Sequence, residues 1–398
     1  MTFSPLTGTR VVDLTSSFAG PTATAILAAL GADVVKVERT GSGDEARDWG
    51  PPFFEGGSVM FFAANPGKRS LALDLSSPQG LDVLLRLADG ADVVVQSLRP
   101  GAAERLGLGP DVLRGRNPRL VYATIGAFGR EGPLASEPGY DPLMQAAAGI
   151  MSVTGEPDRP PVRVGASLVD IGTGVWAALA IVAALHEGAG RTLDLALYET
   201  ALSLLPYQLT DVLAGNASSG RHGTAFPLIV PYQVLATADG ELMLVAANDR
   251  LFAKACAAIG APELADDPRF ASNPLRVENR DELIRLFEEH LAGQPTADAL
   301  ARLRAAGVPA SPVNDLEAVA ADEQLRASGI LQELAGREVV SPPLRADGKR
   351  LRYASPAPRL GEHSAEILRE AGYADEEIDA LVRSGTVDAA GKLPPEEL

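Results

Sequence analysis

VVDLTSSFAGPTATAILAALGADVVKVE, at residues 11–38, predicts a strand, a helix and a second strand in succession. The runs at 11–14 and 33–37 are short and rich in valine, which is typical of strands. Between them, residues 21–30 begin with proline and are followed by glycine, the residues that often open and close a helix. A strand, helix and strand in this order form a βαβ unit, the repeating element of parallel sheets.

The same alternation continues along the chain. Further strand patterns lie at 70–74, 92–96, 120–125 and 191–198, and helical patterns at 79–88 and 199–214. Strands that alternate with helices predict an α/β fold with a doubly wound parallel sheet. We therefore expect a Rossmann-like domain.

The pattern changes in the second half of the chain. Two β-rich runs within 231–246 are joined by Asp239-Gly240, a strong hairpin signal. Helical patterns follow at 250–259, 279–291 and 296–306. Asn279 and Glu282 resemble a capping box, and Gly307 closes the last of these helices.

These patterns predict two domains. Residues 1–224 form the first part of a large α/β domain, and residues 225–325 form an inserted, smaller α+β domain. Residues 326–398 return to complete the large domain, with amphipathic helices expected at 364–371 and 375–383.

Composition indicates an ordinary globular protein with a large core. The chain has 398 residues, of which 46% are hydrophobic and 22% charged, and this length suits two domains. Its formal net charge of -17 argues against nucleic acid and anionic lipid as partners, since both attract basic surfaces. An anionic ligand would therefore have to meet a local group of basic residues.

Three features predict a cytoplasmic protein. Cys256 is the single cysteine, so no intrachain disulfide is possible and a buried apolar role is expected. Residues 1–10 lack the plan of a secretory signal. The apolar run at 171–185 is shorter than the ~20 residues that a membrane span needs, so we expect a core helix there and no membrane.

Several common kinds of site are excluded. The four histidines, His186, His222, His290 and His363, are scattered and none has metal-ligand spacing. No G-x-S-x-G motif links a strand to a helix, which excludes the usual serine hydrolase arrangement. The turn at 15–21 has one glycine where a dinucleotide-binding fingerprint needs three, so nicotinamide binding is not expected.

Asp170 is the candidate catalytic residue. It lies in VRVGASLVDIGTG, residues 162–174, where a strand-like segment meets an apolar helix, and it could either cap that helix or attack an electrophile. Gly172 and Gly174 in the first helical turn cost ~1 kcal/mol each, which suggests that a ligand approaches the backbone. A helix N-terminus stabilises negative charge, so Asp170 is expected to stay ionised between apolar walls.

Basic residues gather in the loops at the ends of the predicted strands. They are Arg39, Arg47, Lys68, Arg69, Arg99 and Arg105. Singly, such residues are usually solvated surface charges. Together, on an acidic protein and at strand ends where α/β folds bind ligands, they predict a site for a phosphate-bearing ligand.

Taken in order, these residues resemble class III coenzyme A transferases, the group of formyl-CoA, carnitine and bile-acid CoA-transferases. The resemblance runs nearly end to end. It rests on residues 11–15 and 19–21, 36–39 with 43–44, 65–70, 99–101 with 105–107, 139–141, the Asp170 segment, 248–249, 267–270 and 360–363.

The resemblance implies a large α/β domain, a small domain and two chains that interlock as a homodimer. It implies an acyl-CoA and a small carboxylic acid as partners, and no cofactor or metal beyond the CoA that the substrate carries. Asp170 matches the family's nucleophile, which forms a mixed anhydride with the donor acyl group and then an aspartyl-CoA thioester. An acceptor carboxylate reverses these steps.

The matching positions also imply a binding site. Arg39 and Arg105 would hold the CoA phosphates or the adenine end, and Leu73, Ser97, Leu98 and Arg99 would line the nucleotide. Tyr140 would lie near the pantetheine arm and Trp49 near the acyl pocket. Phe18 and Ala19 would contact substrate.

The chain departs from formyl-CoA transferase in three places. Phe18 replaces a glutamine, Ser76 replaces a lysine, and a tetraglycine lid is missing between Gly215 and Pro231, so neither oxalate nor formate is expected as substrate. Phe18 and Trp49 suggest a medium-sized or partly apolar acyl group, but a dicarboxylate such as succinate is common in the family. The sequence does not identify the donor or acceptor acid.

Two alternatives share this fold. An α-methylacyl-CoA racemase uses a histidine where this chain has Tyr140, and a tyrosine with a pKa of ~10 is a poor base at neutral pH. The residues therefore favour a transferase. A non-catalytic CoA-binding paralogue would be favoured if Asp170 were absent, and it is present.

Overall fold

A computed structural model of the chain describes residues 3–54, 56–218 and 220–388. The chain divides into two compact units. The first comprises Met1–Ala148, Val164–Pro206 and Arg326–Leu398, and the second comprises Gly149–Arg163 and Tyr207–Leu325. Each unit has its own sheet and hydrophobic core.

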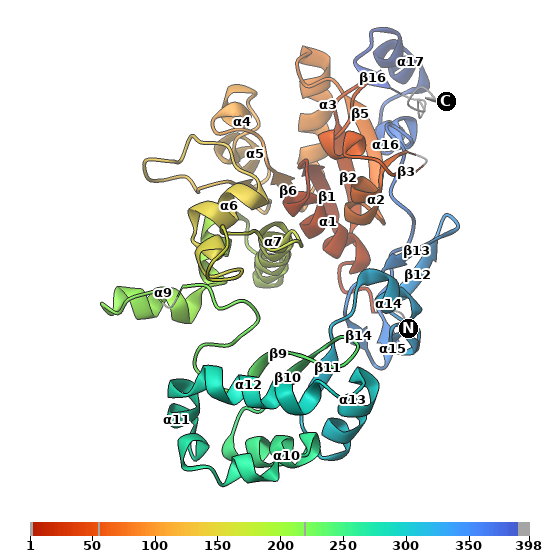
Figure 1. Cartoon of the computed structure of the whole chain (residues 1–398). Coiled ribbons are helices and arrows are strands. Elements are labelled where there is room, and N and C mark those ends of the chain that lie inside the picture. The colour runs from red at the N-terminus through yellow and green to blue at the C-terminus, as the bar shows by residue number, and fades with distance from the viewer. Residues whose placement is uncertain (1–2, 55, 219, 389–398) are drawn as a thin grey trace. The chain divides into compact units, whose positions relative to one another are not determined.

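The first unit is built on a seven-stranded sheet (Figure 1). Its strands are β1 (Arg10–Leu14), β2 (Asp33–Glu38), β5 (Arg69–Leu73), β6 (Val93–Gln96), β7 (Val121–Gly126), β8 (Arg191–Ala196) and β16 (Val387–Asp388). They are ordered β16-β5-β2-β1-β6-β7-β8, and each neighbouring pair is parallel except β16 with β5. This confirms the predicted α/β fold with a mainly parallel sheet. The antiparallel edge strand β16 has two residues, too few to show a pattern in the sequence.

Helices cover both faces of this sheet. On one face, Val12 and Val35 belong to the same core as Leu84 of α3 (Pro78–Asp89) and Leu368 of α16 (Ser364–Glu370). On the other face, α1 (Ala19–Ala29) packs along α7 (Leu168–Glu187), which also contacts β7 and β8. Successive strand residues point to opposite faces.

The second unit contains a three-stranded antiparallel sheet, ordered β11 (Ala310–Pro312), β10 (Glu241–Val245) and β9 (Tyr232–Ala236). The core beside it includes Phe252 of α10 (Asp249–Ile259), Phe287 of α12 (Arg280–Leu291) and Leu303 of α13 (Thr296–Ala305). The predicted hairpin and the three predicted helices are therefore present.

Two local predictions are wrong. The helix expected over 199–214 is two helices, α8 (Leu197–Ser203) and α9 (Pro206–Leu213), because a proline has no amide hydrogen with which to continue a helix. The capping box at Asn279 does not form. The side-chain amide of Asn279 instead donates to the carbonyl oxygens of Leu275 and Arg269, where α11 (Asn273–Glu278) ends.

Helix α7 differs from the fully buried helix that the sequence predicts. It has 20 residues and is long and apolar enough to cross a membrane, by length and composition alone. One side faces the sheet and α1. On the other side, Ile171, Val175, Trp176 and Leu179 are between 43% and 56% exposed. The helix is therefore apolar all round but buried on one side only.

Shorter elements connect these helices and strands. They are η1 (Glu45–Asp48), β3 (Phe53–Phe54), β4 (Gly57–Ser58), α2 (Val59–Ala64), α4 (Ala102–Arg105), α5 (Pro110–Arg116), α6 (Asp141–Ala147), η2 (Ile150–Ser152), η3 (Pro262–Ala265), η4 (Pro268–Phe270), α14 (Leu316–Ala321), α15 (Glu323–Ser328), β12 (Leu331–Leu334), β13 (Arg337–Val340), β14 (Arg345–Ala346), β15 (Lys349–Arg350) and α17 (Asp375–Arg383). Ser17, in the loop between β1 and α1, has a positive φ of 71°, which is uncommon for a residue with a side chain.

Arg276 is expected to hold the second unit together. It is 1% exposed, and its guanidinium donates to the carbonyl oxygens of Val230 and Phe270 and pairs with Asp249. Arg276→Ala leaves these buried carbonyls without a donor, so it should lower the free energy of unfolding by about 3 kcal/mol, as measured by urea denaturation. Arg285→Ala, which removes only exposed ion pairs, should change it by less than ~1 kcal/mol. Equal effects of the two variants would contradict this account.

Candidate active site

The loop after β1 lies where α/β sheets commonly bind ligands. The strand order reverses between β1 and β6, and the carboxyl ends of strands at such a reversal usually form a crevice. The amide of Ser16 in this loop donates to the hydroxyl of Ser97, which follows β6, over 3.1 Å. One hydrogen bond thus joins the loop that carries Phe18 and Ala19 to a residue expected to line the nucleotide.

Asp170 is the third residue of α7, so it is not the residue that caps the helix. Ser167 occupies the capping position but its side chain makes no capping hydrogen bond. Instead Asp141, at the start of α6, accepts hydrogen bonds from the amides of Val169 at 2.8 Å and Asp170 at 3.1 Å. The carboxylate of Asp170 is therefore not needed to cap α7.

The expectation that Asp170 stays fully ionised is wrong. Burial and the nearby negative charge of Asp141 raise the pKa of Asp170 to about 7. Because Asp170 is only partly buried, a substrate can reach a carboxylate that is more basic than an ordinary aspartate.

The two glycines after Asp170 serve helix packing. A Cβ atom on Gly174 would lie 2.8 Å from the carbonyl oxygen of Ala19 in α1, and one on Gly172 would lie 3.0 Å from the methyl group of Thr200 in α8. Both glycines are also in the second turn of α7, since the helix begins at Leu168. Close contact between helices, rather than the approach of a ligand, therefore explains them.

Tyr140 and Trp49 lie beside the loop after β1. Their ring centroids are 6.3 Å apart, and the Tyr140 hydroxyl donates to Glu45 over 3.3 Å. The Ser17 hydroxyl donates to the same carboxylate over 3.1 Å. Burial, and then the charge of Glu45, raise the pKa of Tyr140, so the phenol stays protonated at neutral pH. Glu45 thus connects Tyr140 to the loop that precedes Phe18.

A cavity of about 380 Å³ opens at the carboxyl ends of β6 and β7. Leu98 and Arg99 line it, as the resemblance implies for residues around the nucleotide. Arg130, which pairs with Asp194, also lines it and was missed by sequence reasoning, because nothing in its local pattern distinguishes it from a surface arginine.

The remaining predicted residues differ in exposure. Arg39 and Arg105 are exposed, at the end of β2 and the end of α4. Leu73 is 1% exposed, with its side chain in the core, so only its backbone is available to a ligand.

The prediction that all six basic residues gather around a phosphate-bearing ligand is wrong. Lys68 is buried against Asp13 at 3.1 Å, and Arg47 is buried against Glu38 at 2.7 Å. Arg69 pairs with three exposed carboxylates, those of Asp33, Glu366 and Glu370. These three cations neutralise acids of the fold itself. A charged residue is rarely buried unless it is paired, and the sequence alone does not identify the partner of each cation.

Besides Arg130, sequence reasoning missed Asp141 and Glu45. Asp141 was noted only as part of the run Gly139-Tyr140-Asp141, and its position directly before Pro142 at a helix start gave a weak signal. In residues 3–54, 56–218 and 220–388, no group of three or more His, Cys, Asp or Glu is placed to hold a metal ion.

Comparison with known proteins identifies the family. The family model for CoA-transferase family III matches residues 6–364. The chain belongs to this family. Succinyl-CoA:glutarate CoA-transferase of Mus musculus is 37% identical to this family III CoA-transferase, over 96% of this chain and 90% of the relative. A succinate–glutarate CoA-transferase of Agrobacterium fabrum is 38% identical, over 92% and 95% of the two chains.

Solved structures agree with this membership. A CAIB/BAIF family protein from Brucella suis has a TM-score of 0.84 and 39% identity, and the match covers 93% of this chain and 100% of that one. Rv3272 from M. tuberculosis has a TM-score of 0.84 and 34% identity, covering 92% and 99% of the two chains. The fold of this family III CoA-transferase is thus the fold of the CaiB/BaiF proteins.

The raised pKa of Asp170 predicts a pH-dependent stability. The folded-state pKa of about 7 lies above the ordinary value of 3.8, so the stability that the protonated group contributes is complete below pH 3.8 and is lost as the pH rises through 7. Asp170→Asn is neutral at every pH. This variant should therefore melt at a higher temperature than the wild type at pH 8, with a difference that shrinks toward pH 4. A difference that is constant over this range would contradict the assignment.

Proposed function

We propose that this enzyme transfers CoA from an acyl-CoA donor to a free carboxylic acid, with Asp170 as the nucleophile. One observation carries the proposal. The carboxyl group of Asp170 is partly exposed and has a raised pKa, and no described cation pairs with it. The hydrogen bonds to Asp141 hold its backbone. Such a carboxylate combines a fixed position with greater basicity, and both favour attack on a thioester.

The reaction takes four steps in which bonds formed and broken balance. The Asp170 carboxylate attacks the donor carbonyl, expels the CoA thiolate and leaves a mixed anhydride. The thiolate attacks the aspartyl carbonyl, so the donor leaves as a free carboxylate and an aspartyl-CoA thioester remains. The acceptor carboxylate displaces the thiolate to form a second anhydride. The thiolate then attacks the acceptor carbonyl, which releases the new acyl-CoA and restores Asp170.

The raised pKa of Asp170 suits its attack on the donor. A basic carboxylate is a better nucleophile toward the donor than an ordinary aspartate, provided that it is ionised. At neutral pH a group with a pKa of about 7 is ionised in about half of the molecules.

In the proposed site, Leu98 and Arg99 contact the nucleotide of CoA, and the Tyr140 hydroxyl and Trp49 lie near the pantetheine arm and the acyl group.

Succinyl-CoA and a short dicarboxylic acid are the proposed substrates. Two relatives that are 37% and 38% identical over most of this chain are named for succinyl-CoA or succinate with glutarate. A relative from Acetobacter aceti, 37% identical, is named acetyl-CoA:oxalate CoA-transferase, so oxalate belongs in the same test despite Phe18. Assay of succinyl-CoA against glutarate, oxalate and a monocarboxylate would distinguish these acceptors.

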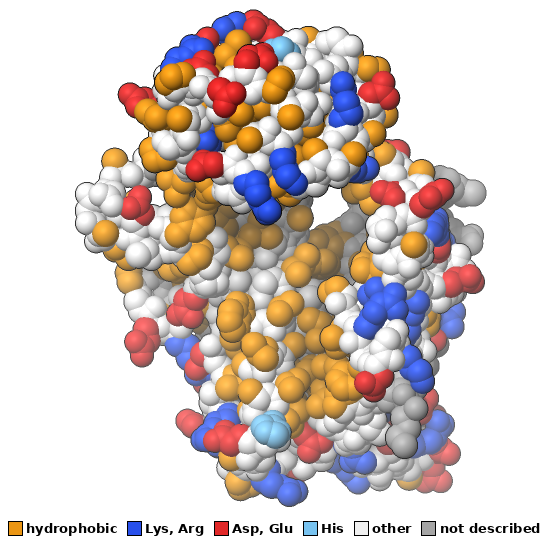
Figure 2. Space-filling model, turned by 90° about the horizontal axis from the view of Figure 1, so that it is seen from below, with side chains coloured by type: hydrophobic (Ala, Val, Ile, Leu, Met, Phe, Trp, Pro, Cys, Tyr) orange, Lys and Arg blue, Asp and Glu red, His pale blue; other side chains and the backbone are white. Residues whose placement is uncertain are grey.

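We also propose the interlocked homodimer, in which residues 225–325 act as a small inserted domain. The exposed side of α7 supports it, because Trp176 and Leu179 are more than half exposed there. Leu143 of the neighbouring α6 is 54% exposed as well. Figure 2 shows groups of hydrophobic side chains on the face that it presents. Contiguous apolar surface of this kind usually marks a protein interface.

The cytoplasmic location, and the lack of a cofactor other than CoA and of nucleic-acid or membrane partners, remain predictions.

The racemase alternative requires a second base opposite Asp170. Tyr140 occupies the sequence position of that base. The raised pKa of its hydroxyl keeps it protonated at neutral pH, so it is a poor candidate for the base. A transferase leaves the α-carbon proton in place. Incubation of a 2-methylacyl-CoA in deuterated water should therefore give no deuterium at that carbon, and its incorporation would favour the racemase.

Asp170→Ala should abolish CoA transfer while CoA binding changes little and the melting temperature does not fall, because the nucleophile is lost from a partly exposed position. With the wild type, acyl-CoA and hydroxylamine together should inactivate the enzyme by converting the activated Asp170 carbonyl to a hydroxamate. Mass spectrometry of the Asp170 peptide checks this. A variant that still turns over acyl-CoA, or an unmodified peptide in the inactivated enzyme, would remove Asp170 from the mechanism.

Leu179→Lys tests the homodimer. A charge on the exposed side of α7 must lose its water when that side is covered, so self-association should weaken by about tenfold or more, as analytical ultracentrifugation would show. Val112→Lys, on α5 and 46% exposed, is the matched control and should leave association unchanged. A wild type that is monomeric at all concentrations would contradict the proposal.

A further inference from the structure

Ser17 is held in a backbone conformation that a residue with a side chain rarely adopts. Its φ is 71°, in the left-handed region that favours glycine. Ser17 lies in the loop between β1 and α1, immediately before Phe18. Strained conformations of this kind persist only where surrounding contacts fix them, and they are most frequent at functional sites.

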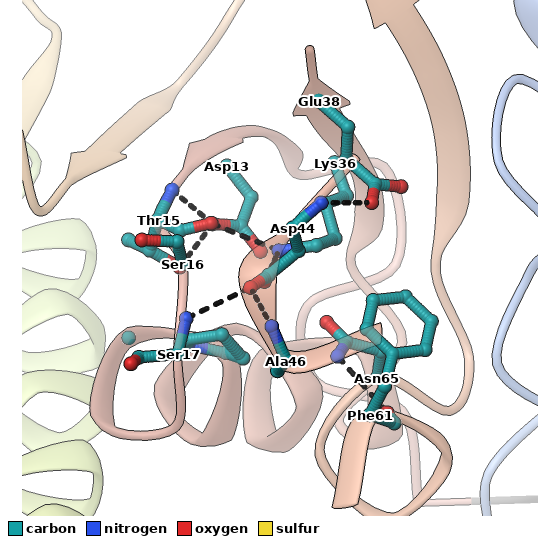
Figure 3. A network of polar contacts seen from close by, with 12 residues as sticks. Asp13, Thr15, Ser16, Ser17, Lys36, Glu38, Asp44, Ala46, Phe61 and Asn65 are labelled. Carbon is teal, nitrogen blue, oxygen red and sulfur yellow. Dashed lines mark hydrogen bonds and ion pairs between the residues drawn. The ribbon is translucent and has the colours of Figure 1, made fainter. Parts of the chain in front are cut away.

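Asp44 supplies the contact that fixes this conformation. It is 4% exposed, and its Oδ1 accepts hydrogen bonds from the amides of Ser17 and Ala46, both at 3.0 Å (Figure 3). Its Oδ2 pairs with the ammonium of Lys36 at 2.8 Å. Lys36 in turn donates to the carbonyl oxygen of Thr15 at 2.8 Å. The Asp44–Lys36 pair therefore binds the backbone of the loop at Thr15 and at Ser17, on either side of Ser16.

The pair is itself anchored in the sheet. Lys36 belongs to β2 and lies opposite Asp13 of β1, so its backbone cannot shift without breaking the sheet. The Asp44 amide donates to Glu38 at the end of β2 over 3.1 Å. Asp44, Asp13 and Glu38 keep the pKa of Lys36 above its ordinary value although burial alone would lower it, so the ammonium stays charged.

Three contacts connect this loop and the start of α1 to the proposed active site. Its Ser16 amide bonds to Ser97, and its Ser17 hydroxyl bonds to Glu45, the partner of Tyr140. After Phe18, α1 begins with Ala19, whose carbonyl oxygen is packed against Gly174, one turn beyond Asp170 in α7. A change in the conformation of Ser17 would therefore move groups that border the nucleophile.

We infer that Asp44, paired with Lys36, is a positioning residue for the transfer reaction: it holds Ser17 in the left-handed conformation and so fixes the loop and the start of α1 beside Asp170. The inference rests on the proposed function. Asp44 touches neither substrate nor reacting atoms in this scheme. It acts through the backbone of Ser17.

A purely structural role for the buried pair is the competing explanation, and Ser17 separates the two. Glycine adopts a positive φ without steric strain. If Asp44 acts by imposing this conformation on Ser17, its removal should matter much less once Ser17 is replaced by glycine. If Asp44 merely supports the core, the replacement at Ser17 should not alter the effect of its removal.

The experiment is a double-mutant cycle on the full-length enzyme, with kcat and KM measured for succinyl-CoA and glutarate. Asp44→Ala alone should lower kcat by at least about tenfold while KM for the acyl-CoA changes by less than about threefold. Added to Ser17→Gly, the same substitution should lower kcat by no more than about threefold. Asp92→Ala is the matched control, because Asp92 also accepts from a backbone amide, that of Arg10 at the other end of β1. It should leave kcat unchanged.

Equal losses from Asp44→Ala in the two backgrounds would overturn the inference, as would full activity of Asp44→Ala. If Asp44→Ala does not fold, Asp44→Asn keeps the side-chain shape and an oxygen that can accept from Ser17 but removes the charge that pairs with Lys36. The inference then predicts that kcat falls by no more than about threefold, and a loss of tenfold or more with asparagine would overturn it. A wild type that transfers no CoA, or an active Asp170→Ala variant, would instead show that the proposed function has failed.

Discussion

The site depends on the hydrogen bonds that Asp141 accepts from the first turn of α7. The first amides of a helix have no partner within the helix, and here a carboxylate from α6 supplies one for Val169 and Asp170. This leaves the Asp170 side chain free of a capping role. It also places a second negative charge beside Asp170, which together with burial raises its pKa. Asp141 therefore contributes both to the position of Asp170 and, after burial, to its raised pKa.

Several charged residues are buried in and beside the sheet beneath the site. Asp13 of β1, Lys36 of β2 and Lys68, which directly precedes β5, have almost no exposure, and each is paired. Removing one partner of such a pair leaves an uncompensated charge in the interior, which is strongly unfavourable. These pairs fix the ends of the strands and the loops that follow them.

The sequence predicts the parts of the fold that depend on local patterns. The β1–α1–β2 unit, the alternation that follows it and the hairpin at Asp239-Gly240 are all encoded in short runs of residues, and Asp170 stands out beside its glycines. The partners of Asp170 and Ser17 are not predictable in this way. Asp141 is 29 residues from Asp170, and Asp44 is 27 residues from Ser17. Such pairs form only when the sheet brings distant loops together, and the same holds for the burial of Lys68 and Arg47.

The central claim is that the Asp170 carboxylate becomes covalently acylated in each cycle, and oxygen exchange tests it most directly. Turnover with an acceptor acid labelled with oxygen-18 in its carboxylate passes one labelled oxygen through the second anhydride to the aspartate. The account predicts that, after several turnovers, heavy oxygen appears in the Asp170 peptide and at no other carboxylate of the protein. Rapid turnover with no label in that peptide would show that CoA moves between the acids without a covalent bond to Asp170.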